Sequence, residues 1–168
     1  MSFFIGDYFQ AYPAAKIYAS PGLPEKRKDL KFRYILKDSP EIEWQAELDQ
    51  IIFFGHPALQ EVIFYHRPSR TLIVADLVMY FDEDSTFLTR WVARLWGMYK
   101  QPIPPMDFKV TLTQKMQVRL CLERILQWDF ERVILAHGGL IEKEGKKTLQ
   151  EAFAWVYENQ GEKIRPVG

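Results

Sequence analysis

The sequence predicts a single-domain α/β protein, with residues 1–168 forming one unit. Two observations support this fold class. Short apolar runs of strand length alternate with longer segments whose apolar residues recur at helical spacing. The chain of 168 residues, of which 48% are hydrophobic, is also long enough to bury a substantial core.

A β-hairpin over residues 61–78 is the segment around which we expect the rest of the chain to be organised. Two apolar runs, 62–65 and 71–75, flank a turn that contains Pro68, which cannot donate a backbone hydrogen bond to a strand ladder. Both arms are apolar at successive positions, which predicts that both faces of the hairpin are buried. The second arm runs directly into Asp76, and a carboxylate at the end of a buried strand needs a partner.

The other expected elements follow the same patterns along the chain. Ser39-Pro40-Glu41 has the residue types of a helix start, and Thr148 with Glu151 matches a capping box. Apolar residues at helical spacing after residue 86, from Phe87 to Tyr99, predict a helix with one core-facing side. In order, we expect a helix at 3–12, a strand at 16–19, a helix at 39–48, a strand at 51–54, the hairpin, helices at 87–99 and 118–128, a strand at 132–136 and a helix from 148 onward.

Composition and charge exclude several classes of function. Lys plus Arg and Asp plus Glu both total 22, so no overall field favours nucleic acid or an anionic membrane. Cys121 is the only cysteine, which excludes an internal disulfide and a thiolate metal cluster and agrees with a reducing compartment. No signal peptide or membrane-spanning run is visible, so we expect a cytoplasmic protein. The basic excess at residues 23–37 is typical of a solvated surface.

Three predicted strands end in residues that suit a metal site. The strand at 51–54 is followed by Gly55-His56, the second hairpin arm by Asp76, and the strand at 132–136 by His137-Gly138. If these ends gather at one edge, two imidazoles and a carboxylate form a ligand set that suits zinc or iron. Each residue also has a structural alternative, because strand-end aspartates accept backbone hydrogen bonds and histidines pack in turns.

These residues and their surroundings resemble the second half of the metallo-β-lactamase superfamily. The resemblance rests on Gly55-His56-Pro57, on the hairpin ending in Asp76 and on ILAHG at 134–138. Over nearly the whole chain, the amino-acid sequence is similar to that of a domain family of unknown function within that superfamily. It implies a four-layer αββα sandwich truncated at the N-terminus, in which His56, Asp76 and His137 are the metal ligands. The superfamily's H-x-H-x-D-H motif is absent, since no histidine precedes His56.

The resemblance leaves three readings of function open. The first is a metal-dependent hydrolase of unknown small-molecule substrate, with Asp76 as catalytic residue and ligand and at most one ion of zinc, iron or manganese. The second is a non-catalytic module that binds a small molecule or protein on the same scaffold. In the third, residues upstream of Met1 complete the ligand set. His66, in the hairpin turn, is expected at the surface.

Overall fold

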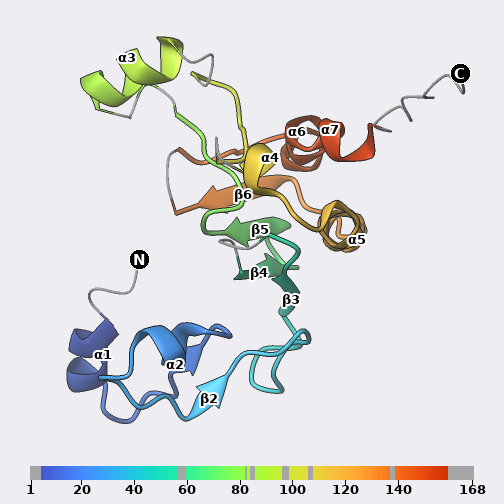
Figure 1. Ribbon diagram of the computed structural model, residues 1–168. Helices are drawn as coiled ribbons and strands as arrows, with labels where there is room; N and C mark the ends of the chain where they lie inside the picture. The colour runs from blue at the N-terminus through green and yellow to red at the C-terminus, as the bar shows by residue number, and fades with distance from the viewer. Residues whose placement is uncertain are drawn as a thin grey trace, which may run out of the picture.

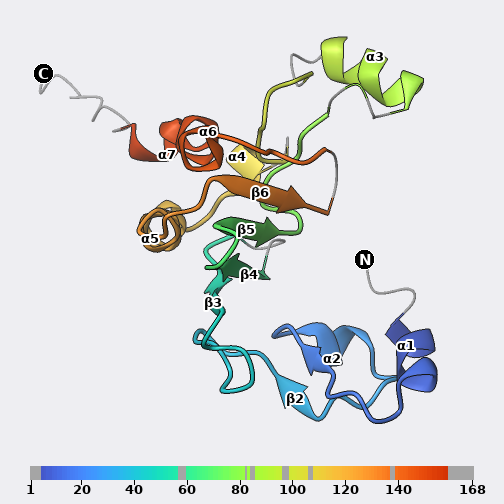
Figure 2. The same ribbon diagram turned by 180° about the vertical axis from the view of Figure 1, so that it is seen from behind.

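A computed structural model describes residues 5–56, 60–81, 83, 86–95, 99–105, 108–136 and 139–158. The chain forms a four-stranded sheet with helices packed on one face, and a small N-terminal substructure lies beyond the first strand of the sheet (Figure 1). The opposite view shows the same arrangement, with α5, α6 and α7 gathered on one side (Figure 2).

The N-terminal substructure is made of short elements. It contains α1 (Ile5–Ala11), β1 (Tyr18–Ala19), α2 (Leu23–Lys26) and β2 (Tyr34–Ile35), and β1 and β2 pair in parallel. The rings of Tyr18 and Tyr34 stack at 4.9 Å, and Trp44 meets Tyr18 edge-on. The Trp44 indole donates to Gln50 in the main sheet, so this aromatic group joins the two parts of the chain.

The main sheet has the strand order β3-β4-β5-β6. The strands β3 (Leu48–Phe53), β4 (Glu61–His66) and β5 (Thr71–Val74) are antiparallel neighbours, whereas β6 (Arg132–Leu135) is parallel to β5. The hairpin predicted from the sequence is therefore confirmed. Because β3, β5 and β6 all run in one direction, their carboxyl ends lie at the same edge of the sheet.

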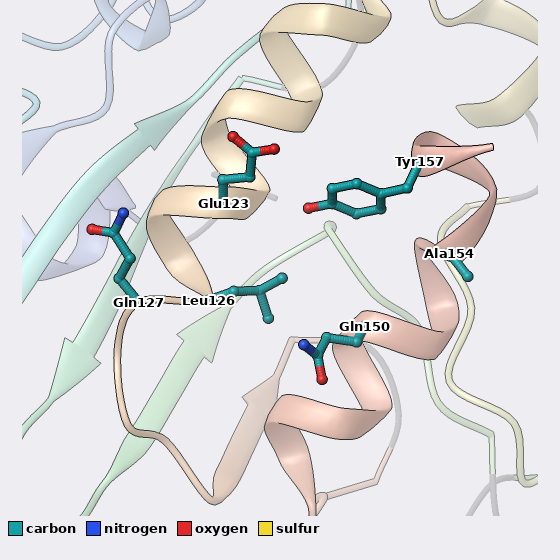
Figure 3. A pocket seen from close by; sticks show the side chains of 6 residues that line it. All are labelled: Glu123, Leu126, Gln127, Gln150, Ala154 and Tyr157. Atoms are coloured by element: carbon teal, nitrogen blue, oxygen red, sulfur yellow. The ribbon is translucent and has the colours of Figure 1, made fainter. Parts of the chain in front are cut away.

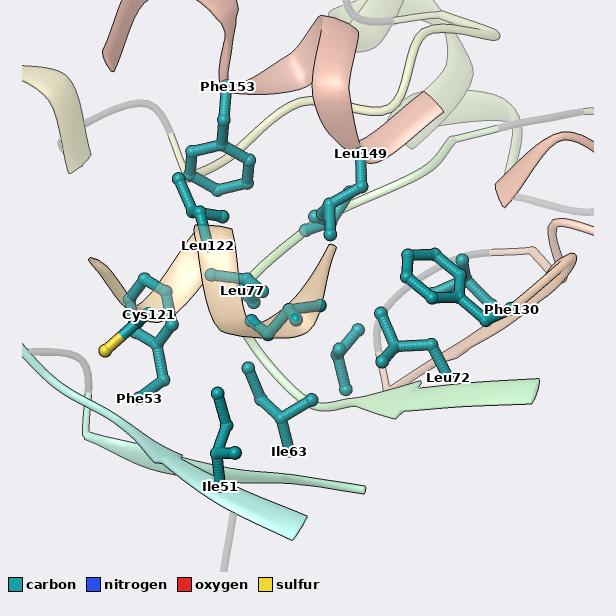
Figure 4. Packing of buried hydrophobic residues seen from close by; sticks show 14 of the residues in the cluster. Ile51, Phe53, Ile63, Leu72, Leu77, Cys121, Leu122, Phe130, Leu149 and Phe153 are labelled. Atoms are coloured by element: carbon teal, nitrogen blue, oxygen red, sulfur yellow. The ribbon is translucent and has the colours of Figure 1, made fainter. Parts of the chain in front are cut away.

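Helices α5 (Lys115–Ile125), α6 (Gly145–Ala152) and α7 (Ala154–Tyr157) cover one face of the sheet. The core between helices and sheet contains Phe53, Ile63 and Leu72 from the strands, Leu122 from α5 and Phe153 from the junction of α6 and α7 (Figure 4). The apolar stripe predicted for the helix after residue 118 is confirmed, since Val118, Cys121, Leu122 and Ile125 are all buried. The short α4 (Phe108–Thr111) adds Phe108, which is fully buried.

Burial of the hairpin departs from the prediction. Along β4, buried and half-buried residues alternate, with Glu61, Ile63 and Tyr65 buried and the intervening residues partly exposed. The sheet is thus covered by helices on one face, and the second apolar face is not buried within the described residues. Successive apolar residues predicted burial on both faces, which was wrong because a run of this kind gives no information on what packs against it.

Two predicted helical features also differ. The segment from Ser39 to Leu48 is not a helix but overlapping turns, in which the backbone N–H groups of Gln45 and Leu48 donate to Glu41 and Trp44. Helix α6 begins at Gly145, so Thr148 lies inside it rather than at a cap. Gly145 suits this position because a Cβ there would lie 2.8 Å from the Glu131 carbonyl oxygen.

The helix predicted after residue 86 exists as α3 (Phe87–Leu95), but it is not part of the core. Three of the apolar residues predicted to face the core are exposed: Phe87 by 75%, Leu88 by 69% and Trp91 by 55%. Figures 1 and 2 both show α3 standing away from the sheet and from α5–α7. The expected residues from Trp96 to Met98 lie outside the described part of the chain.

Candidate functional site: the carboxyl edge of the sheet

The strand register places the candidate residues at one edge. Phe53, the last residue of β3, pairs with Glu61, the first residue of β4, and Val74 at the end of β5 pairs with Leu135 at the end of β6. Beyond the strands, the backbone N–H of Gly139 donates to the Tyr80 carbonyl at 3.0 Å, so the segments after β5 and β6 stay side by side. The predicted common edge is confirmed for all three strand ends.

Gly55 allows the chain to leave β3 sharply. Its φ is 105°, a left-handed value that L side chains rarely adopt. A Cβ at this position would lie 2.8 Å from the Gln117 Cβ and 2.9 Å from the Val118 nitrogen, both at the start of α5. The Gly55 carbonyl in turn accepts a bond from the Gln114 N–H at 3.3 Å. The turn that carries His56 is therefore braced against α5.

His56 is packed inside the protein. It is only 7% exposed, and its ring lies almost parallel to that of Phe108, with 4.4 Å between the centroids and 11° between the planes. Its Nε2 lies 2.7 Å from the Thr111 hydroxyl oxygen. Both partners belong to α4, so this short helix fixes the position of the imidazole. The contacts are those of a histidine with a structural role.

Asp76 is half-buried just after β5, and its backbone is held by a second carboxylate. The Glu61 carboxylate accepts the Asp76 N–H at 2.6 Å and the Ala75 N–H at 3.2 Å. Extending the β4–β5 register brings Glu61 opposite Asp76, and this explains why its side chain reaches these backbone groups. Glu61 thus closes the end of the β4–β5 ladder with its side chain.

Burial determines the electrostatic state of Glu61. The residue is 8% exposed, and its desolvation raises the pKa of the carboxyl group to about 7, although the hydrogen bonds from Asp76 and Ala75 act in the opposite direction. The negative charge of nearby Asp76 adds to the increase. Two carboxyl groups therefore meet at this edge, and one of them titrates near neutral pH.

Sequence reasoning missed Glu61. It was read only as the residue before an apolar run, and a single glutamate at a strand start is usually exposed. The informative signal is the antiparallel register, which pairs the first residue of one hairpin arm with the residue after the other arm. The register can be read from the sequence only when the exact residues of the hairpin turn are known.

Two of the three predicted ligands lie in the described part of the chain. His56 and Asp76 lie at the shared edge, and His137 lies outside the described residues. Within the described part of the chain, no group of three or more His, Cys, Asp or Glu side chains could hold a metal ion. A catalytic zinc site requires three protein ligands, so the described residues by themselves do not fit a metal. His66, expected in the hairpin turn and at the surface, is the last residue of β4 and is half-buried, with its Nδ1 2.7 Å from the Ser69 hydroxyl oxygen.

A surface groove lies elsewhere, in the helical layer. It has a volume of about 530 Å³ and lies between α5 and α6–α7 (Figure 3). Six residues line it: Glu123, Leu126, Gln127, Gln150, Ala154 and Tyr157. None of them belongs to the strand-end edge, so the groove is separate from the candidate site.

Comparisons with known proteins identify the fold. No family model and no curated protein sequence matches the chain. Solved structures do match. An archaeal metallo-β-lactamase superfamily protein from Sulfolobus tokodaii has a TM-score of 0.55 and 16% identity, over 98% of this chain and 67% of that one.

Two further structures agree. A metallo-β-lactamase from Pontibacter korlensis matches with a TM-score of 0.55 and 11% identity, over 91% of this chain and 62% of that one. DIM-1 metallo-β-lactamase matches with a TM-score of 0.52 and 15% identity, over 90% of this chain and 62% of that one.

The class of the protein follows: this is an α/β chain with the metallo-β-lactamase fold, as the sequence predicted. The chain spans 62% to 67% of the length of these solved structures. Its described residues provide one four-stranded sheet with its helical layer, besides the two-stranded pair of β1 and β2. Among the described helices, none is long and apolar enough to cross a membrane.

Proposed function

We propose that this protein is a non-catalytic binding module on a metallo-β-lactamase scaffold, with a degenerate site at the carboxyl edge of the sheet. The observation that carries the proposal is the role of His56. Its ring is stacked on Phe108 and its Nε2 is bonded to Thr111, as in a packed structural residue. Glu61 supports the same conclusion, because its carboxylate serves backbone N–H groups.

The ligand class that suits this edge is a small polar molecule. Asp76 is a half-buried carboxylate at this edge, and the segments after β5 and β6 lie side by side there. Carboxylates and backbone groups at strand ends are the polar contacts that α/β folds use to orient ligands.

A second function is favoured by the shared strand edge. The carboxyl ends of β3, β5 and β6 lie together, so His56, Asp76 and His137 all follow strands that end at one edge. On this alternative, the three residues hold at most one ion, and the protein is a metal-dependent hydrolase.

Thermal melting with and without zinc or manganese separates the two functions. For the binding module, we expect the melting temperature of the wild type to be unchanged by either metal. A hydrolase with a working site would be stabilised by about 2.7 kcal/mol at 100-fold excess over the Kd, which corresponds to roughly 5–10 °C for a chain of this size.

Two variants complete this experiment. Asp76→Ala would abolish a specific metal-dependent shift, whereas His66→Ala, which removes the histidine at the end of β4, would leave it in place. A shift in the wild type that Asp76→Ala removes and His66→Ala retains would refute the non-catalytic proposal. Elemental analysis of protein purified without chelator provides an independent readout.

A further inference from the structure

The groove between α5 and α6–α7 is a cavity that neither the core nor the strand-end site uses. The residues of α5 that face the sheet are buried: Val118, Cys121, Leu122 and Ile125. The six groove residues are instead half-buried or exposed, so the groove opens on the side of these helices that faces away from the sheet. Its volume of about 530 Å³ lies within the usual range of small-molecule pockets.

Part of the groove wall is apolar. The Leu126 side chain of α5 and the Tyr157 ring of α7 both point into the space between the helices (Figure 3). Burial of apolar surface against such a wall is favourable. This part of the groove therefore suits the apolar body of a small molecule, a ring above all, because aromatic rings pack well on one another.

The hydroxyl group of Tyr157 lacks a partner. Its oxygen is buried and makes no hydrogen bond within the described residues. Figure 3 shows it pointing across the groove toward α5, between Glu123 and Leu126. Burial raises the pKa of Tyr157, and the Glu123 carboxylate raises it further, so the hydroxyl keeps its proton. Because a buried polar atom without a partner is costly, a molecule that supplies this hydrogen bond is favoured in the groove.

The charge at this end of the groove is negative. Among the six groove residues, Glu123 alone carries a charge. Its Oε1 accepts a hydrogen bond from the Arg119 Nε at 2.8 Å, and the Arg119 guanidinium lies 5.3 Å from the centroid of the Tyr157 ring. A carboxylate has roughly four acceptor positions, so Glu123 can accept from further donors. Arg119 is not a groove residue, and a molecule in the groove therefore meets the carboxylate rather than the guanidinium.

We infer that this groove binds a small organic cation, namely a primary amine carried on an apolar, ring-sized body. The ammonium group donates to the Glu123 carboxylate and to the Tyr157 hydroxyl oxygen, and the apolar body packs on Leu126 and the Tyr157 ring. Such an amine is charged at neutral pH, as the lysine side chain is. A carboxylate or phosphate would instead bring its acceptors to the carboxylate of Glu123. Binding here is independent of whether the strand-end site holds a metal.

NMR titration with three ring compounds of similar size tests the charge preference. Phenethylamine carries the ammonium group, phenethyl alcohol is neutral and hydrocinnamate is anionic. The amine should shift the backbone amide resonances of residues 123–127 and 150–157 in the wild type, with a Kd on the order of 1 mM. The alcohol should bind at the same place roughly tenfold more weakly, because it lacks the charge-assisted hydrogen bond, and hydrocinnamate should not bind.

Two variants identify the groups that the amine contacts. Glu123→Gln should weaken amine binding roughly tenfold and leave the affinity for the alcohol unchanged, and Tyr157→Phe should weaken amine binding roughly two- to tenfold. The matched controls are Glu47→Gln, in the turns before β3, and Tyr12→Phe, at a residue that is 60% exposed just after α1. Both control variants should bind the amine like the wild type.

Thermal melting without any ligand tests the state of the Tyr157 hydroxyl. Tyr157→Phe removes a buried polar atom that has no partner, so its melting temperature should equal or exceed that of the wild type. Tyr12→Phe should melt like the wild type. A clearly lower melting temperature for Tyr157→Phe would show that the hydroxyl is already hydrogen-bonded in the free protein, and this would overturn the inference.

Four results of the titrations would also overturn it. They are an amine that shifts no resonance of the groove, amide shifts that lie mainly outside the groove, equal affinities for the amine, the alcohol and hydrocinnamate, and amine binding that Glu123→Gln leaves unchanged.

Discussion

At the scale of single residues, Glu61 has the least expected environment in the molecule. It is a carboxyl group that is almost fully buried, and its neighbours are backbone N–H groups and Asp76. The desolvation that raises its pKa to about 7 makes the stability of the fold depend on its protonation.

The pH dependence of stability follows from the direction of this shift. The pKa of Glu61 is raised from 4.5 in the unfolded chain to about 7 in the folded protein, so the folded state binds this proton more tightly. The stabilisation is complete below about pH 4.5 and is lost as the pH rises through 7, by roughly 3 kcal/mol in total. Denaturant unfolding of the wild type from pH 5 to 8 should therefore show decreasing stability.

Glu61→Gln provides the comparison, because glutamine stays neutral over this range. The variant can lose a backbone hydrogen bond, so its absolute stability is not the readout. Its stability should vary less with pH than that of the wild type, while Glu151→Gln, at an exposed position of α6, should follow the wild type. If the free energy of unfolding varies equally with pH in the wild type and in Glu61→Gln, Glu61 does not titrate in this range.

His56 provides a second prediction at the same scale. Thr111→Val keeps the shape of the side chain but removes the hydroxyl that lies 2.7 Å from the His56 Nε2. One hydrogen bond contributes roughly 0.5–1.5 kcal/mol net, so we expect a loss of stability of this size in chemical denaturation. Thr113→Val, at an exposed residue between α4 and α5, is the matched control and should have little effect. A Thr111→Val variant as stable as the wild type would show that the hydrogen bond between His56 and Thr111 does not stabilise the fold.

At the scale of elements, the turn after β3 depends on a glycine whose replacement would press against α5. Gly55 and Gly22 both have positive φ values, of 105° and 80°, but only Gly55 lacks room for a side chain. We expect Gly22→Ala to cost about 1 kcal/mol through backbone strain, and Gly55→Ala to cost several kcal/mol, because α5 must also move. Urea unfolding of both variants measures the difference, and equal losses would mean that the contact with α5 is not tight.

The elements also show which parts of the structure were predictable. The hairpin and the buried stripe of α5 were predicted correctly, because turn residues and helical periodicity act locally. The prediction of a helix at 39–48 was wrong. Residues typical of a helix start are present, but the Trp44 side chain bonds Gln50 and the segment is held in turns. The α3 stripe was identified as a helical face but not as an exposed one, since periodicity shows that a face is apolar and not what covers it.

The candidate site was predictable to a similar degree. The sequence placed His56 and Asp76 at strand ends, and the structure confirms the common edge. The sequence could not show that Phe108 and Thr111 contact His56, because those residues come from a short helix more than fifty positions away. Contacts at such separations depend on the packing of the whole core.

At the scale of the whole molecule, the parallel pairing of β5 and β6 has a consequence for how the chain folds. The three strands β3, β4 and β5 are joined by short connections and can pair as a local meander. Strand β6 joins them only after the chain from Ala75 to Glu131 has closed into a loop, at a cost in conformational entropy. The carboxyl edge that includes Asp76 is therefore completed only when β6 pairs with β5, after the hairpin has formed. Until then, the edge of β5 that will pair with β6 is exposed and can pair with a strand of another chain.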